Sequence, residues 1–199
     1  MRQITFDLYD FRELSEAAKT RAINDAREEA AEAELSCLYD DFSTTLQGIS
    51  YALGIEVRDY NVGGSQPPFF RFDVYGELNE EDPAFFMRWI NGVLSRIEKC
   101  KFYYLGGTRR ASKITKTIED WPFSGLWLDE KPEKVFRRYA DYIKAGRTIH
   151  EFCEDVLMAL ADGYTDYAEY AYSDEATGVF IENNDFSFTE NGERFACAV

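Results

Sequence analysis

Residues 148–172 read TIHEFCEDVLMALADGYTDYAEYAY and predict a helix, the longest of the chain. At about 100° per residue, one face of this helix collects its apolar side chains. Five carboxylates lie within about 60° of one another on the opposite face. This acidic stripe consists of Glu151, Asp155, Asp162, Asp166 and Glu169. Burial of the apolar face would turn the stripe outward, toward solvent or a partner.

The acidic stripe has little positive charge beside it. Only Arg147 lies in or near the helix, and like charges four residues apart cost about 0.2–0.5 kcal/mol per pair. The helical rise separates the carboxylates by about 4.5 to 10 Å along the axis, a spacing comparable to that of phosphates along a nucleic-acid strand. We therefore expect the stripe to occupy a basic groove of a partner protein in place of nucleic acid. The alternative is an ordinary solvated acidic face.

Helices and strands are interleaved irregularly around this helix. The pattern predicts strands at 3–9, 55–61, 69–75 and 101–105, helices at 15–34, 42–53, 83–97, 132–144 and 148–172, a short helix from 173, and a closing hairpin from 186 that turns at Asn191-Gly192. Because regular strand-helix-strand alternation is absent, we expect an α+β fold. The prediction is a single domain over residues 1–199, with a mostly antiparallel sheet and about five to six helices packed on it.

The composition indicates a folded protein and argues against several classes of function. Of the 199 residues, 45% are hydrophobic, which is too many for a disordered chain. Lys and Arg number 22 against 37 Asp and Glu, a net charge of −15. This charge opposes a general role in binding nucleic acid or an anionic membrane surface. No stretch predicts a signal peptide or a membrane span, so we expect a cytoplasmic protein.

The middle of the chain is basic, although both ends are acidic. Residues 96–147 carry 13 Lys and Arg against 7 Asp and Glu. Within them, GGTRRASK at 106–113 combines glycines, hydroxyls and cations, a mixture that suits a bound phosphate, although it lacks the order of a P-loop. The second hypothesis is therefore a nucleotide- or nucleic-acid-binding module that uses Arg109, Arg110, Lys113 and Lys116.

Catalytic and metal sites have little support in the sequence. His150 is the only histidine, which removes metal sites that need two imidazoles. Cys153 lies three residues further along, on the apolar face, where a thiol is inert. The four cysteines show no metal-binding spacing. A carboxylate-metal hydrolase is the third hypothesis, because magnesium sites need only carboxylates. We expect no enzyme activity, no metal and no cofactor.

Three motifs resemble a family of uncharacterised acidic proteins encoded by phages and prophages, some of which carry the label antitoxin of a toxin-antitoxin stability system. They are YDFRELSEAAK at 9–19, WPFSG at 121–125, and the tail from SDEA at 173–176 through FSFTENG at 186–192. The resemblance implies a phage or prophage origin and a single α+β domain, and it brings no catalytic residues. Small acidic phage proteins also include anti-CRISPR and anti-restriction inhibitors, which is a second, functional analogy.

The leading hypothesis is a non-enzymatic phage protein that inhibits a host protein by presenting the acidic stripe to a basic, nucleic-acid-binding groove. The expected partner is a CRISPR effector, a restriction enzyme or a toxin in the cytoplasm of a bacterial host. The hypothesis predicts no direct binding of nucleic acid. A homodimer formed through an exposed aromatic patch stays open.

Overall fold

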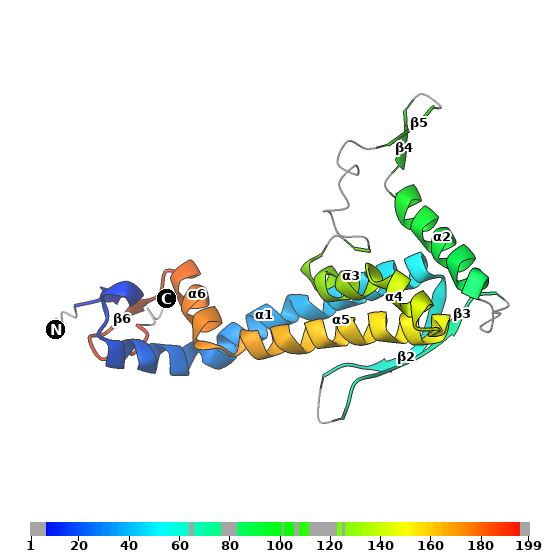
Figure 1. The fold of residues 1–199 in the computed structure, drawn as a ribbon. Coiled ribbons are helices and arrows are strands. Elements are labelled where there is room, and N and C mark those ends of the chain that lie inside the picture. Colours follow the sequence, from blue (N-terminus) through cyan, green and yellow to red (C-terminus); the bar gives the residue numbers. More distant parts are fainter. Residues whose placement is uncertain are drawn as a thin grey trace. The chain divides into compact units, whose positions relative to one another are not determined.

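The computed structural model describes residues 7–63, 66–76, 83–100, 102–105, 108–111, 123–124 and 126–195. The chain divides into two compact units (Figure 1). Unit 1 takes the described residues up to Leu38 and from Asp166 onward, and unit 2 takes Tyr39–Thr165. The division into units does not decide whether residues 1–199 form one domain, which stays a prediction.

The longest helix is α1, Glu16–Leu53, with 38 residues. Two predictions are wrong here: this segment is one helix rather than two, and the helix at 148–172 is not the longest of the chain. No glycine or proline stands between residues 16 and 47, and Asp40-Asp41 continues the helix without a break. The predicted helix end is confirmed: Gly54 follows α1 with φ of 68°, and its N–H donates to the carbonyl of Ser50 at 2.9 Å.

Unit 1 packs small residues of α1 against the end of the chain. Its core consists of Leu14, Ala18, Ala22, Ala26, Ile181 and Phe188. Strand β1, Tyr9–Asp10, pairs antiparallel with β6, Ser187–Phe188, and a 3₁₀ helix follows β1 at Phe11–Glu13. Of the strand predicted at 3–9, only Tyr9 falls in β1, and residues 3–6 lie outside the described part of the chain.

Helix α6, Asp174–Asn183, precedes β6 and begins where the sequence predicts a helix start. The Ser173 hydroxyl caps it by accepting a hydrogen bond from the Ala176 N–H at 3.1 Å. After β6 the chain turns, with φ of 82° at Gly192 and a bridge between Phe188 and Arg194. The predicted closing turn is therefore present, and its strand also pairs with β1 from the other end of the sequence.

Unit 2 begins with the hairpin of β2, Ile55–Asn61, and β3, Phe69–Val74, as the sequence predicts. Helix α2, Pro83–Cys100, and strand β4, Phe102–Leu105, also follow the prediction. Strand β5, Thr108–Ala111, pairs with β4 in a stretch where no strand is predicted from the sequence. A 3₁₀ helix at Trp127–Asp129 then leads into α3, Glu130–Phe136, and α4, Tyr139–Lys144, which a turn at Arg137-Arg138 separates within the predicted helix at 132–144.

Helix α5, Ile149–Ala171, supplies the apolar face that the sequence predicts. Its fully buried side chains include Phe152, Val156, Leu157 and Leu160 in unit 2. The α+β class is confirmed, with six α-helices and only antiparallel strand pairing among the described residues. The strands form three separate two-stranded sheets, so helix is the larger component of the fold.

Candidate functional site

The first carboxylate of the acidic stripe, Glu151, caps the start of α5. Its Oε2 accepts hydrogen bonds from the Thr148 N–H at 2.7 Å and from the Thr148 hydroxyl at 3.2 Å, and the same hydroxyl accepts from the Glu151 N–H at 3.1 Å. This reciprocal arrangement satisfies backbone donors that the helix itself cannot. The backbone hydrogen bond from Thr148, aided by the charge of Arg147, lowers the pKa of Glu151.

The second carboxylate, Asp155, is bound by two side chains from outside the helix. The Arg147 guanidinium lies 2.8 Å from Asp155 and 3.5 Å from Glu151, so one cation serves two members of the stripe. The Tyr142 hydroxyl donates to Asp155 at 2.6 Å, and Arg147 also lies over the Tyr142 ring, 4.9 Å from its centroid. Burial and the bond to Asp155 raise the pKa of Tyr142 to about 12. These two carboxylates therefore already stabilise the protein's own structure.

The other three members of the stripe, Asp162, Asp166 and Glu169, are exposed. Asp162 belongs to unit 2, where its backbone carbonyl accepts a hydrogen bond from the Lys131 ammonium at 3.1 Å. Asp166 and Glu169 belong to unit 1. Of the five carboxylates of the predicted stripe, two therefore share Arg147, and three are exposed and divided between the units.

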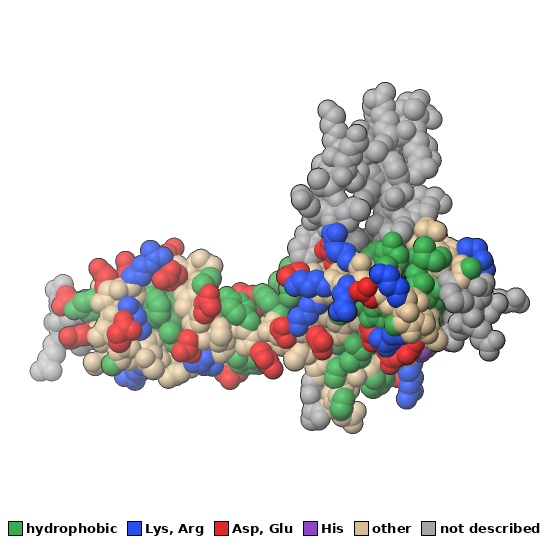
Figure 2. Space-filling model, in the orientation of Figure 1, with side chains coloured by type: hydrophobic (Ala, Val, Ile, Leu, Met, Phe, Trp, Pro, Cys, Tyr) green, Lys and Arg blue, Asp and Glu red, His purple; other side chains and the backbone are tan. Residues whose placement is uncertain are grey.

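Negative charge is concentrated in unit 1. Its residues include 17 carboxylates against 6 Lys and Arg, a net charge of −11, whereas unit 2 has 20 against 16, a net charge of −4. Every described cation of unit 1 already has a carboxylate partner: the pairs are Arg12–Glu182, Lys19–Glu16, Arg21–Glu193, Arg27–Asp174 and Arg194–Glu29. Figure 2 shows carboxylates spread over the face of unit 1 in view, with fewer cations among them.

A second row of carboxylates, on α1, is not among the predicted site residues. Asp25, Glu28, Glu29 and Glu32 are all exposed and fall within an arc of about 100° on the helix. Arg194 lies 2.6 Å from Glu29, and Arg21 lies 3.9 Å from Asp25. The spacing of three and four residues is visible in the sequence. The alanines between these carboxylates, however, indicate the buried face of the helix and not the acidic one.

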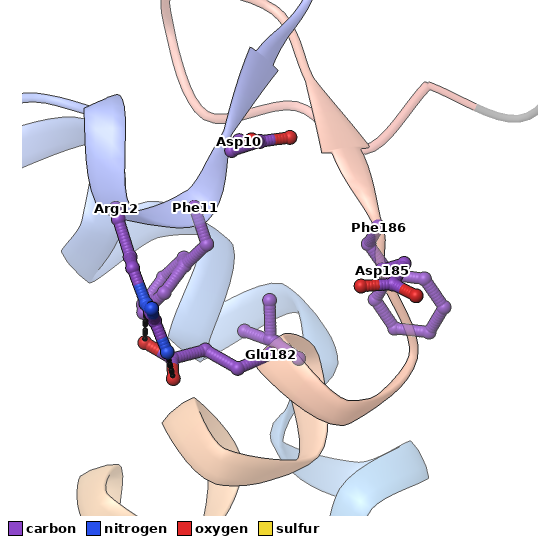
Figure 3. Close-up of a pocket in the computed structure, with 7 residues that line it drawn as sticks. Asp10, Phe11, Arg12, Glu182, Asp185 and Phe186 are labelled. Atoms are coloured by element: carbon purple, nitrogen blue, oxygen red, sulfur yellow. Dashed lines mark hydrogen bonds and ion pairs between the residues drawn. The ribbon is translucent and has the colours of Figure 1, made fainter.

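Unit 1 also contains a small pocket of about 230 Å³ beside β1 and α6. Figure 3 shows the Arg12 guanidinium bound to the Glu182 carboxylate on one side and Asp185 with Phe186 on the other. The two hydrogen bonds of that pair measure 3.1 and 2.6 Å, and the pair raises the pKa of Arg12 and lowers that of Glu182. The pocket therefore presents mostly negative charge, as the rest of unit 1 does.

The structure gives less support to the two alternative hypotheses, the basic nucleotide-binding site and the carboxylate-metal site. Arg109 and Arg110 belong to β5, where the structure describes the backbone but not the side chains, and Lys113 and Lys116 lie outside the described residues. Among the described residues, no group of three or more His, Cys, Asp or Glu side chains is placed to hold a metal ion.

The thiol and the imidazole at the start of α5 face different surroundings. Cys153 is buried, and burial raises the pKa of its thiol, so thiolate is disfavoured there. The His150 ring is stacked on Phe72, with centroids 4.5 Å apart. Burial favours a packing role for Cys153, and the exposed His150 ring covers Phe72.

Comparison of the chain with protein-family models, with curated proteins and with solved structures finds no match in any of the three. The resemblance to acidic phage proteins therefore stays a prediction. Of the helices in the described part of the chain, none has the length and apolar composition needed to cross a membrane.

Proposed function

We propose that this chain is a non-enzymatic interaction protein that binds a basic, nucleic-acid-binding surface of a partner protein through the carboxylates of unit 1. One observation carries the proposal: each described cation of unit 1 is already in an ion pair, while the carboxylates outnumber the cations by 17 to 6. The excess negative charge has no described counterpart of opposite sign within its unit. A partner rich in Arg and Lys would supply one.

The physical basis is long-range attraction followed by short-range pairing. A surface of one sign raises the rate at which an oppositely charged partner arrives. Exposed charges are screened beyond about 8 Å at physiological ionic strength, so such a complex weakens as salt rises. Anionic chains such as nucleic acids would compete for the same basic surface, and the acidic chain itself would repel them.

The structure narrows the residues that this function would use. Glu151 and Asp155 already bind Arg147, so their charges are partly compensated. The exposed carboxylates of unit 1 include Asp166 and Glu169 of the predicted stripe and Glu28 and Glu32 of α1. Asp162 is the exposed member in unit 2 and forms a separate test. By analogy with small acidic phage proteins, the partner class would be a CRISPR effector, a restriction enzyme or a toxin in the bacterial cytoplasm.

The test is affinity capture from a bacterial lysate with the wild-type chain and with charge-reversed variants. One variant is Asp166→Lys with Glu169→Lys, and another is Glu28→Lys with Glu32→Lys. An exposed ion pair contributes about 0.2–1 kcal/mol, and reversal replaces attraction by repulsion. Two reversals should therefore weaken capture by about 1–4 kcal/mol, which is at least about fivefold. The matched control reverses two exposed carboxylates of unit 2, Asp40 and Glu154, with the same change in net charge.

A second test concerns whether the captured protein binds nucleic acid. It should be a nucleic-acid-binding protein, and a short DNA or RNA duplex should release it from the immobilised chain. In a gel-shift titration, the chain alone should shift neither single-stranded RNA nor DNA. Capture that is equal for unit 1 and unit 2 variants, or release by neutral polymer as readily as by nucleic acid, would falsify the proposal.

A further inference from the structure

A pocket in unit 2 is lined by aromatic rings. It has a volume of about 500 Å³ and lies where α1 ends and β2 begins. Tyr51 from α1, Tyr75 after β3 and Trp89 from α2 line it, together with Leu53 and Ile55. The volume is within the range of sites that hold small ligands or single side chains.

The pocket has a firm base and exposed walls. Leu53 and Ile55 are buried at 0% and 3% exposure, whereas Tyr51 and Tyr75 are 61% and 62% exposed. The Tyr75 N–H donates to the Gly54 carbonyl at 2.9 Å, which ties the end of β3 to the end of α1. Trp89 is held edge-on by Phe86 and Phe152, with centroids 5.8 and 6.1 Å away. The rings therefore surround a site whose floor is already packed.

The electrostatics of the pocket favour a cation. None of the described residues that line it is charged, so the aromatic rings are the groups with which an entering cation would interact, and aromatic faces attract cations. Unit 2, which contains the pocket, carries a net charge of −4, a sign that favours cations over phosphates. The arginine of the adjoining hairpin, Arg58, is bound to Glu56 at 2.5 Å and to Asp73 at 2.9 Å. Arg88 of α2 lies over the Phe85 ring instead, 5.6 Å from its centroid.

We infer that this aromatic pocket binds a guanidinium group, such as the side chain of an exposed arginine on a partner protein. The flat guanidinium stacks on aromatic faces and sheds water more readily than an ammonium does. The lining residues Tyr51, Tyr75 and Trp89 also carry hydroxyl and indole N–H groups that can form hydrogen bonds. All residues that line the pocket belong to unit 2, so this inference and the proposed function can fail independently.

The test is a titration of the whole chain with N-acetyl-arginine methylamide, followed by the indole N–H signals in nitrogen-proton correlation NMR. The Trp89→Phe variant assigns the Trp89 signal. The matched neutral probe is N-acetyl-citrulline methylamide, which replaces the guanidinium by a urea of the same shape. The arginine probe should shift the Trp89 signal and bind at least twofold more tightly than the citrulline probe.

Removal of one ring should weaken binding of the arginine probe by about two- to fivefold, because a cation over an exposed ring gains about 0.5–1 kcal/mol. The variants are Tyr51→Ala and Tyr75→Ala, whose side chains are exposed enough to be removed without unfolding. Tyr172→Ala, which removes an exposed ring in unit 1, should change nothing. Equal binding of the two probes, a Trp89 signal that does not move, or an equal effect of all three tyrosine variants would overturn the inference.

Discussion

Replacement of Asp129 by alanine should destabilise unit 2 severely, because this buried carboxylate holds the segment before α3. Asp129 is 0% exposed. Its Oδ2 accepts hydrogen bonds from the Ser124 N–H at 2.8 Å and the Phe123 N–H at 3.3 Å, and its Oδ1 accepts from the Ser124 hydroxyl at 2.8 Å. That hydroxyl also lies 3.0 Å from the Thr45 hydroxyl of α1. One side chain thus joins three parts of the unit.

The magnitude follows from these contacts. A hydrogen bond to a charged group contributes about 1.5–3 kcal/mol, and a buried donor left without an acceptor costs about 1–3 kcal/mol. Counting only the two contacts at 2.8 Å, alanine should lower the free energy of unfolding by about 3–6 kcal/mol. Asparagine keeps one acceptor oxygen and should cost less. Since whole domains are stable by only about 5–15 kcal/mol, the alanine variant should be close to unfolding.

Urea unfolding, followed by tryptophan fluorescence, measures the loss. Trp127 is a local reporter, because its indole N–H donates to Asp41 of α1 at 3.1 Å. The control is Asp141→Ala, which removes an exposed carboxylate 3.6 Å from Arg138 and should cost less than about 1 kcal/mol. If Asp129→Ala loses no more than this control, the buried carboxylate does not hold the segment and the reasoning fails.

Two further predictions concern one backbone position and one phenol. A Cβ at Gly192, where φ is 82°, would collide with the Ala18 carbonyl. Left-handed strain alone costs about 1–2 kcal/mol, so Gly192→Ala should destabilise unit 1 by more than that amount. Hydrogen exchange should show a larger loss of stability for this variant than for the control Gly146→Ala, where φ is 67° and the space is open. For Tyr142, the raised pKa means that the unfolded phenol ionises first, at about pH 10. Stability should therefore fall as pH rises from about 10 to 12, and Asp155→Asn should shrink this loss in urea titrations; an unchanged profile would contradict it.

Local signals in the sequence predict local structure well. Gly54, Ser173 and Pro83 mark one helix end and two helix starts, and the structure confirms each. The spacing of apolar residues also predicts the burial of Phe152 and Leu157. These features depend on backbone geometry and hydrophobic period, which neighbouring residues determine.

Features that depend on distant parts of the chain are harder to predict. The pairing of β1 with β6 joins Tyr9 to Phe188. Each strand has only two residues, which is too short to show the alternation of apolar and polar side chains that predicts a strand. The division of α1 at Asp40-Asp41 is wrong because two adjacent carboxylates weaken a helix without ending it, and the packing of Phe42 and Leu38 on either side continues it.

The charge pattern of the candidate site is visible in the sequence, but its compensation is not. Arg147 is recognisable as the one nearby cation, yet its simultaneous pairing with Glu151 and Asp155 requires the turn before α5. The Tyr142 hydroxyl of α4 donates to Asp155 of α5, and the spacing of residues along one helix does not predict such a contact between two helices. Sequence reasoning therefore identifies which carboxylates share a helix face, and the fold decides which of them are already in use.

The composition of unit 1 from two distant segments has a consequence for synthesis of the protein. The unit 1 core joins Leu14, Ala18, Ala22 and Ala26 to Ile181 and Phe188 near the other end of the sequence, whereas unit 2 is one continuous stretch of chain. On the ribosome, the first segment would emerge before all of unit 2 and would wait for residues 166–195 before its alanine-lined face is covered. Its closure requires contacts between the most widely separated parts of the sequence, the kind that form slowly. Until then the abundant carboxylates of that segment would keep it dispersed in water.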